Sequence, residues 1–183
     1  MTGGFNNPPN KTFIMKILFC ICFLVTVTGA LHPAAAQTPA AATAFNKVID
    51  GYLGVKDALV AANGPQASAK ARELMAAIDA VPAAQLSPAQ QKAWQTAQPK
   101  LLFDSRHISE VDKVPHQREH FATLSANLTK LLKEIPLNKA VLYAETCTMT
   151  KNTFLSLSAT GRDPYMGMDN CSKVNATLPA AHH

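Results

Sequence analysis

Residues 112–136, DKVPHQREHFATLSANLTKLLKEIP, carry the clearest helical pattern in the chain. The side chains expected on its core face recur at intervals of three and four residues, and all but one are apolar: Phe121, Leu124, Ser125, Leu128, Leu131, Leu132 and Ile135. The pattern begins near Asp112 to Pro115, and Pro136 ends it because proline cannot continue a helix. We therefore expect a helix that buries one face against other elements.

Three earlier segments show the same periodicity. Residues Thr38 to Ala62 predict a first helix that Asn63-Gly64-Pro65 ends, and a second set of apolar residues runs from Ala71 to Val81. Ser87-Pro88 is a typical start for a third helix, which Pro99 is expected to kink or split. Four amphipathic helices with short connections predict a mainly α fold, an up-down four-helix bundle.

The pattern changes after Asn138. Ala140 to Tyr143 and Phe154 to Leu157 are short apolar runs that predict strands, and Thr160 to Pro164 marks a turn. We expect a small irregular or short-strand C-terminal segment folded against the bundle. Residues 37–183 are then long enough for a single domain with one core.

The first 36 residues predict a secretory signal peptide. Lys11 and Lys16 precede an apolar run from Ile17 to Val27, and Ala34-Ala35-Ala36 supplies small residues for cleavage. The run is shorter than the roughly 20 residues that a membrane span needs, so we expect a periplasmic product with no stable membrane anchor. The chain has a formal charge of +5 with its basic residues scattered singly, which does not indicate a nucleic-acid partner.

Loss of the signal peptide leaves two cysteines, in a compartment where thiols are normally oxidised. Each lies close to methionine: Cys147-Thr148-Met149 forms one group, and Met166-Gly167-Met168 precedes Cys171. Soft sulfur ligands select copper(I), silver(I) or zinc over hard cations. Two interpretations stay open at this point. One is a soft-metal site, and the other is a Cys147–Cys171 disulfide with the methionines as packing residues.

The segment from His116 to His120 fits the H-x-x-E-H pattern of one metallopeptidase class. Histidines at i and i+4 share a helix face, so a zinc peptidase is a third hypothesis. No partner segment, nucleophile elbow or phosphate-binding glycine loop accompanies the pattern, and we expect no enzyme. His120 lies at the border of the apolar face and can reach a group packed on the helix, whereas His116 points further into solvent. His107 is expected to be a lone surface residue.

Several motifs occur in a fixed order: Gln117-Arg118-Glu119-His120-Phe121 with Leu124-Ser125, then Cys147-x-Met149, then Phe154-Leu155-Ser156, then Asp163-Pro164-Tyr165-x-Gly167-x-Met168 and Cys171. Together they make the chain similar to a family of bacterial periplasmic domains of unknown function. Members of that family occur free or fused to the adaptor (membrane fusion) proteins of copper and silver efflux pumps. The similarity extends from about Phe45 to Val174.

The resemblance implies a copper(I) site whose ligands lie at Cys147, Met149, Met168, Cys171 and His120. Met166 does not match, because the family has an aromatic residue there, and four other positions depart from its pattern: Thr148, Phe154, Asp163 and Ser172. We expect the C-terminal segment to fold back on the fourth helix and bring the sulfur ligands to His120. The role would be metal sequestration or hand-over, with an efflux adaptor or a metallochaperone as partner.

Overall fold

The computed structural model describes residues 1, 3–4, 39–169 and 172–181. The chain divides into two units, Met1–Pro33 and Ala34–His183, and every helix and strand described below belongs to the second. The signal peptide predicted over residues 1–36 lies almost wholly outside the described residues, as do Cys171, His182 and His183. In the described ranges, no helix has the length and apolar character needed to cross a membrane.

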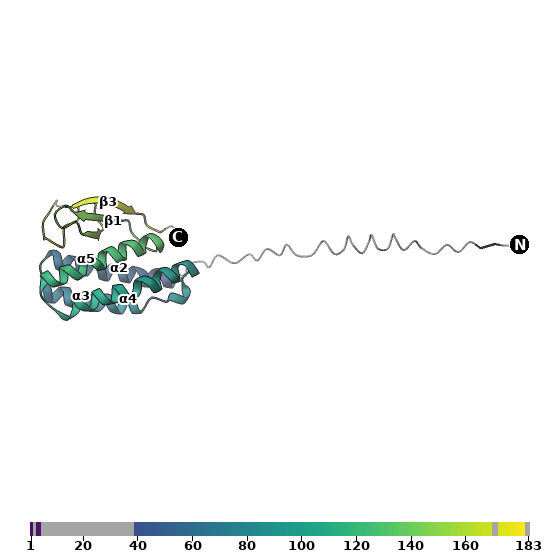
Figure 1. The fold of residues 1–183 in the computed structure, drawn as a ribbon, viewed down its shortest axis with the longest axis horizontal. Helices are drawn as coiled ribbons and strands as arrows, with labels where there is room; N and C mark the ends of the chain where they lie inside the picture. The colour runs from purple at the N-terminus through teal and green to yellow at the C-terminus, as the bar shows by residue number, and fades with distance from the viewer. Residues whose placement is uncertain (2, 5–38, 170–171, 182–183) are drawn as a thin grey trace. The chain divides into compact units, whose positions relative to one another are not determined.

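Four helices form the predicted bundle: α2 (Pro39–Val60), α3 (Gly64–Asp79), α4 (Pro88–Glu110) and α5 (Val114–Glu134), with a 3₁₀ turn, η1 (Ala83–Gln85), before α4. Each α-helix packs against the next one in the chain. In Figure 1, α3 and α4 lie on one side of the bundle and α2 and α5 on the other, where a small sheet covers them. The bundle with a C-terminal strand segment is the fold that the periodicity predicts.

Local signals explain where the helices begin. The Ser87 hydroxyl accepts a hydrogen bond from the N–H of Gln90, and the Gln90 side chain accepts one from the N–H of Ser87, which is a capping box. Asn63 ends the first helical pattern but also caps α3, since its side chain accepts from the N–H of Gln66 at 3.1 Å. Pro99 lies inside α4, which continues through it, so the predicted split is wrong. Proline has no backbone N–H, so α4 lacks one hydrogen bond at Pro99. The packing of α4 against α3 and α5 stabilises the helix by more than this loss costs.

The faces predicted to be apolar form the core. In α5 all seven predicted residues are buried, from Phe121 to Ile135. The Phe121 ring stacks on Tyr52 of α2, with 5.0 Å between the ring centroids, and Trp94 of α4 meets Phe45 edge-on at 5.9 Å. Aromatic pairs of this kind contribute about 0.5–1.5 kcal/mol beyond the burial of their surface.

Gln117 of α5 joins the start of α3 to the end of α4. Its buried side-chain amide donates to the carbonyls of Gly64, at 3.0 Å, and Ile108, at 3.1 Å. The two helix ends approach closely at this point, and a Cβ atom on Gly64 would overlap the carbonyl oxygen of Asp112. The glycine of the Asn63-Gly64-Pro65 turn is therefore required by packing as well as by the turn.

The C-terminal segment forms an antiparallel sheet of three strands, β1 (Leu142–Cys147), β2 (Thr153–Ser156) and β3 (Ser172–Leu178), in the order β2-β1-β3. The run at 154–157 corresponds to β2, whereas the run at 140–143 overlaps only the start of β1. Strand β3 was not predicted. Most of its side chains are exposed, so it has no apolar run that would mark it as a strand.

A β-bulge interrupts the pairing of β1 with β3. Ala144 pairs with Ala176, but the next residue, Glu145, pairs with Val174, so that Asn175 is the extra residue. The Asn175 side chain donates to the Thr146 hydroxyl at 2.9 Å across the two strands. After the bulge the register places Cys147 opposite Ser172.

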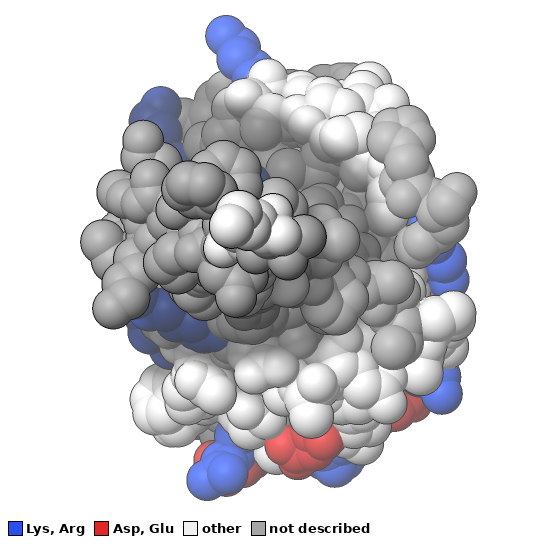
Figure 2. Space-filling view, turned by 90° about the vertical axis from the view of Figure 1, so that its right-hand side faces the viewer, with Lys and Arg blue, Asp and Glu red and all other residues white. Residues whose placement is uncertain are grey.

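Charged side chains are distributed over the surface, some of them in ion pairs. On the face shown in Figure 2, Lys and Arg side chains are spread around the rim, with Asp and Glu at its lower edge. Several form exposed ion pairs, such as Lys139 with Asp50 at 3.1 Å and Arg162 with Asp169 at 2.7 Å. Exposed pairs contribute about 0–1 kcal/mol each, so they do not determine the fold.

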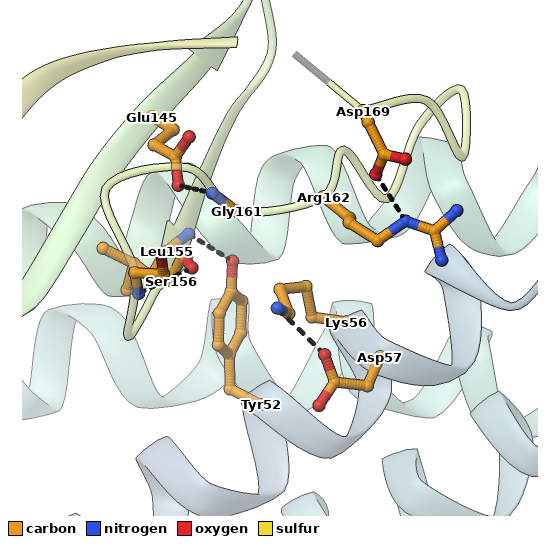
Figure 3. Close-up of polar contacts among 10 residues, drawn as sticks. Tyr52, Lys56, Asp57, Glu145, Leu155, Ser156, Gly161, Arg162 and Asp169 are labelled. Carbon is orange, nitrogen blue, oxygen red and sulfur yellow. Dashed lines mark hydrogen bonds and ion pairs between the residues drawn. The ribbon is translucent and has the colours of Figure 1, made fainter. Parts of the chain in front are cut away.

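The hydroxyl of Tyr52 connects the bundle to the sheet. Tyr52 is fully buried, and its oxygen lies 2.7 Å from the Ser125 hydroxyl of α5 and accepts from the N–H of Leu155 in β2 at 3.0 Å. Figure 3 shows the ring reaching from its helix to the Leu155 backbone. Because β2 is an edge strand, this N–H faces the helices rather than a neighbouring strand.

We expect Tyr52→Phe to lower the free energy of unfolding by about 1–3 kcal/mol, because it leaves the buried N–H of Leu155 without its acceptor. Urea unfolding followed by circular dichroism measures this change. Tyr143→Phe is the matched control, because the Tyr143 hydroxyl has no hydrogen bond in the described structure and its loss should be nearly neutral. Equal stabilities for the two variants would contradict the role given to Tyr52.

We expect the folded chain to lose stability as the pH rises above about 10, the usual pKa of tyrosine. Burial raises the pKa of both Tyr52 and Tyr165 well above that value. The unfolded chain therefore binds fewer protons than the folded chain above about pH 10, and the free energy of unfolding falls. Urea unfolding from about pH 9 to about pH 11 should show a shallower fall in Tyr52→Phe/Tyr165→Phe than in the wild type. Parallel curves would contradict the prediction.

Candidate functional site

Cys147 ends β1 and begins a tight turn into β2. Its side chain is buried, and its sulfur accepts a hydrogen bond from the N–H of Thr150 at 3.5 Å. The Cys147 carbonyl accepts from the N–H of Lys151, which has a positive φ of 62°. A backbone N–H directed at a cysteine sulfur is an arrangement that tunes metal–thiolate centres.

The three methionines of the C-terminal segment are exposed rather than packed in the core. Met149, two residues after Cys147, is 60% exposed, and Met166 and Met168 are 42% and 46% exposed. Their thioether groups are therefore accessible from solvent and contribute little to packing.

A second turn carries Met166 and Met168. Asp163 is buried, and its carboxylate accepts from the N–H groups of Tyr165, at 2.6 Å, and Met166, at 3.3 Å. Gly167 has a positive φ of 67° and donates to the Asp163 carbonyl. Asp163, which departs from the family pattern noted above, therefore accepts three hydrogen bonds from backbone N–H groups of this turn.

Tyr165 joins the second turn to the sheet and to the bundle. Its hydroxyl donates to the Thr153 carbonyl at 2.6 Å, and its ring lies 6.0 Å from Phe121 of α5, between centroids. Burial raises the pKa of the Tyr165 hydroxyl well above its usual range, and negative charge on Tyr52, Asp163 and Cys147 adds to the rise. Cys147 and Tyr165 are thus close enough to act on each other electrostatically.

Other contacts fix the second turn against the strands and α2. The buried carboxylate of Glu145 in β1 accepts from the N–H of Gly161 at 3.0 Å, as Figure 3 shows, and from the hydroxyl of Ser172 at 2.6 Å. Arg118 of α5 donates to the Leu59 carbonyl at the end of α2. Burial lowers the pKa of Arg118, and the charge of Asp163 opposes that shift.

The register of the sheet places Cys147 at the end where β3 begins. Cys147 pairs with Ser172, which directly follows Cys171 in the sequence. Cys171 itself lies outside the described residues, so the metal site and the Cys147–Cys171 disulfide both stay predictions.

His120 packs on α4, as its position on the border of the apolar face predicts. Its Nδ1 atom lies 3.2 Å from a carboxylate oxygen of the buried Asp104, and its side chain is 19% exposed. Among the described residues, its side chain has a hydrogen bond or ring contact with Asp104, Phe103, His107 and His116. Cys147 lies at the end of β1, whereas His120 packs between α5 and α4.

His107 is not the lone surface residue that its sequence context suggests. Its ring stacks on that of His120 with 4.5 Å between centroids, and the His116 ring lies 4.8 Å from His120. The periodicity of each helix predicts only which face each histidine occupies. It contains no information on contacts between α4 and α5. With the side chains as they stand, no group of three His, Cys, Asp or Glu residues in the described ranges is arranged to hold a metal ion.

No similarity to a curated protein or to a solved structure was found. A family model matches residues 48–140, which is half of the chain. The match covers most of α2, all of α3, α4 and α5, and stops before β1. The chain belongs to the family described as "Protein of unknown function (DUF3347)".

Proposed function

We propose that this chain binds a soft monovalent ion, copper(I) or silver(I), at the end of the C-terminal sheet. The ligands in this proposal are sulfur atoms of Cys147, Met149, Met168 and Cys171. Thiolate and thioether sulfur together favour such ions over hard cations, and zinc is the next candidate.

One observation carries the proposal, and it is the register of β1 with β3. Because Cys147 pairs with Ser172, the Cys147–Met149 turn lies at the end of the sheet where β3 begins, next in sequence to Cys171. Residues more than twenty positions apart in the sequence thereby enter one neighbourhood. A soft-metal site needs such a convergence of sulfur ligands.

The surroundings of the sulfur atoms are consistent with this role. The N–H of Thr150 donates to the Cys147 sulfur, while Met149 and Met168 reach solvent. In this proposal an incoming ion first meets the exposed methionine sulfur atoms and then binds the buried cysteine sulfur. Such an arrangement suits transfer between proteins as well as storage.

His120 has no part in the ligand set proposed here. Its neighbours are Asp104, His107 and His116, all on α4 and α5. The five-ligand site that includes His120 is therefore reduced to its four sulfur members.

We further propose that the chain acts in the periplasm, where it sequesters the ion or passes it to an efflux adaptor or a metallochaperone. This proposal rests on the signal-peptide pattern of residues 1–36 and on the resemblance to domains fused to efflux adaptors. It assigns the chain a binding role without catalysis.

The same register supports a second candidate, a structural or interaction module closed by a Cys147–Cys171 disulfide. A disulfide lowers the mass by the two hydrogen atoms of the thiols, whereas a bound ion raises it. Native mass spectrometry of protein isolated from the periplasm separates the two outcomes.

We expect the reduced protein to bind one copper(I) or silver(I) ion per chain, and Cys147→Ser to abolish binding. Met149→Leu and Met168→Leu should each weaken binding about tenfold or more, since loss of a ligand costs at least as much as loss of an outer-shell partner. Competition titration against a chromophoric copper(I) chelator measures these affinities.

Two methionine controls sharpen this experiment. Met75→Leu changes a methionine of α3 in the bundle, and Met166→Leu changes an exposed methionine that the resemblance does not include. Both should leave the affinity unchanged. Reduced protein that binds neither ion, or equal effects of all four methionine-to-leucine changes, would overturn the metal proposal.

A further inference from the structure

Three histidines come together on the outer surface of α4 and α5, away from the sulfur residues. The His107 and His120 rings stack at 4.5 Å with an angle of 24° between their planes, and the His116 ring meets His120 edge-on at 4.8 Å. The sequence has six histidines, so half of them lie in this one cluster. Neither the bundle core nor the proposed sulfur site uses them.

In each of these rings the polar contact found among the described residues is made by the Nδ1 atom. The Nδ1 atom of His107 lies 2.9 Å from the Phe103 carbonyl, and that of His120 lies 3.2 Å from the Asp104 carboxylate. The Nδ1 atom of His116 is 3.8 Å from the Glu119 carboxylate. An oxygen acceptor at Nδ1 places the proton there and leaves the Nε2 lone pair available.

This arrangement resembles the outer shell of known histidine–metal centres. A metal-binding histidine almost always donates its second ring N–H to a carboxylate or a backbone carbonyl, which fixes the tautomer and the ring orientation. Here His120 has the carboxylate and His107 the carbonyl. Asp104 is itself only 4% exposed, so a carboxylate with little access to water is directed at an imidazole.

The cluster is accessible from solvent. His107 and His116 are partly exposed, and a groove of about 520 Å³ between α4 and α5 borders His120, Phe103 and Asp104. The Phe103 side chain at its edge is 56% exposed. An ion can therefore reach His120 along this groove, and the partly exposed rings of His107 and His116 from solvent, without opening the bundle.

We propose that His107, His116 and His120 form a second metal site, for a borderline divalent ion such as zinc(II) or copper(II), with Asp104 as a positioning residue. Imidazole nitrogen favours these ions, and His116 and His120 have the i, i+4 spacing that zinc sites use. In the present arrangement the rings stack rather than converge, so binding requires His107 and His116 to turn about their side-chain torsions. The site uses none of the sulfur ligands of the proposed function.

The test is a zinc(II) titration by isothermal calorimetry on Cys147→Ser protein, which lacks the proposed sulfur site, with His32, His182 and His183, the histidines outside the described residues, also replaced by alanine. We expect one zinc ion per chain. His107→Gln and His116→Gln should each weaken binding strongly, and Asp104→Asn should weaken it about 10- to 100-fold. Nitrogen coupling in the electron paramagnetic resonance spectrum of the copper(II) form should diminish with each histidine removed.

Arg106→Gln, an exposed change on α4 between Asp104 and His107, is the matched control and should leave zinc affinity unchanged. His107 and His116 lie outside the core, so their variants should keep the wild-type thermal midpoint while losing zinc. Absence of zinc binding, or binding that survives both histidine changes, would overturn the proposal. Cys147→Ser should retain zinc binding, and His116→Gln should retain copper(I) binding, so failure of one site is distinguishable from failure of the other.

Discussion

The attachment of the sheet to the bundle depends on one buried phenol. The Tyr52 oxygen accepts from the N–H of Leu155, which leaves its own hydrogen available to the Ser125 hydroxyl. One side chain from α2 thereby satisfies a backbone group of an edge strand and a side chain of α5. Without that acceptor, the inner edge of β2 would present an unsatisfied donor to an apolar core. The position of the Cys147 turn, at the other end of the β1–β2 pair, follows from this attachment.

The motif around His120 is mostly architectural. Gln117 joins two helix ends, Arg118 binds the end of α2, and Phe121 stacks on Tyr52. Each of these side chains has a partner in a different element, which explains why the motif is dense in large and polar residues. His120 differs, because the hydrogen bond and ring contacts of its side chain, among the described residues, are with α4 and with its own helix. Gln117, Arg118 and Phe121 thus connect elements of the fold, whereas the imidazole of His120 has no such connecting role.

Much of the fold could be predicted from local patterns, because the helices bury regular apolar faces. All the expected core residues of α5 are buried, and the Ser87-Pro88 start is correct. Pro99 does not split α4, because packing on both sides keeps the helix continuous. Strand β3 was not predicted, because an edge strand with exposed side chains has no apolar pattern.

The candidate sites were harder to predict than the fold, for a physical reason. The proposed sulfur ligands are recognisable by residue type, but the position of Cys147 opposite Ser172 depends on the β1–β3 register, which involves residues far apart in the sequence. The histidine cluster depends on a contact between α4 and α5. Helical periodicity shows which face a residue occupies and not which residue of a neighbouring helix it meets.

The bulge at Asn175 limits how the length of this protein can change. By adding one residue to β3, it moves the pairing partner of Cys147 from Lys173 to Ser172. A single insertion or deletion between Ser172 and Asn175 would turn the first half of the strand over, because successive strand residues face opposite sides of the sheet. Length variation is therefore better tolerated in the exposed residues 157–160, just after β2, than in the few residues that begin β3.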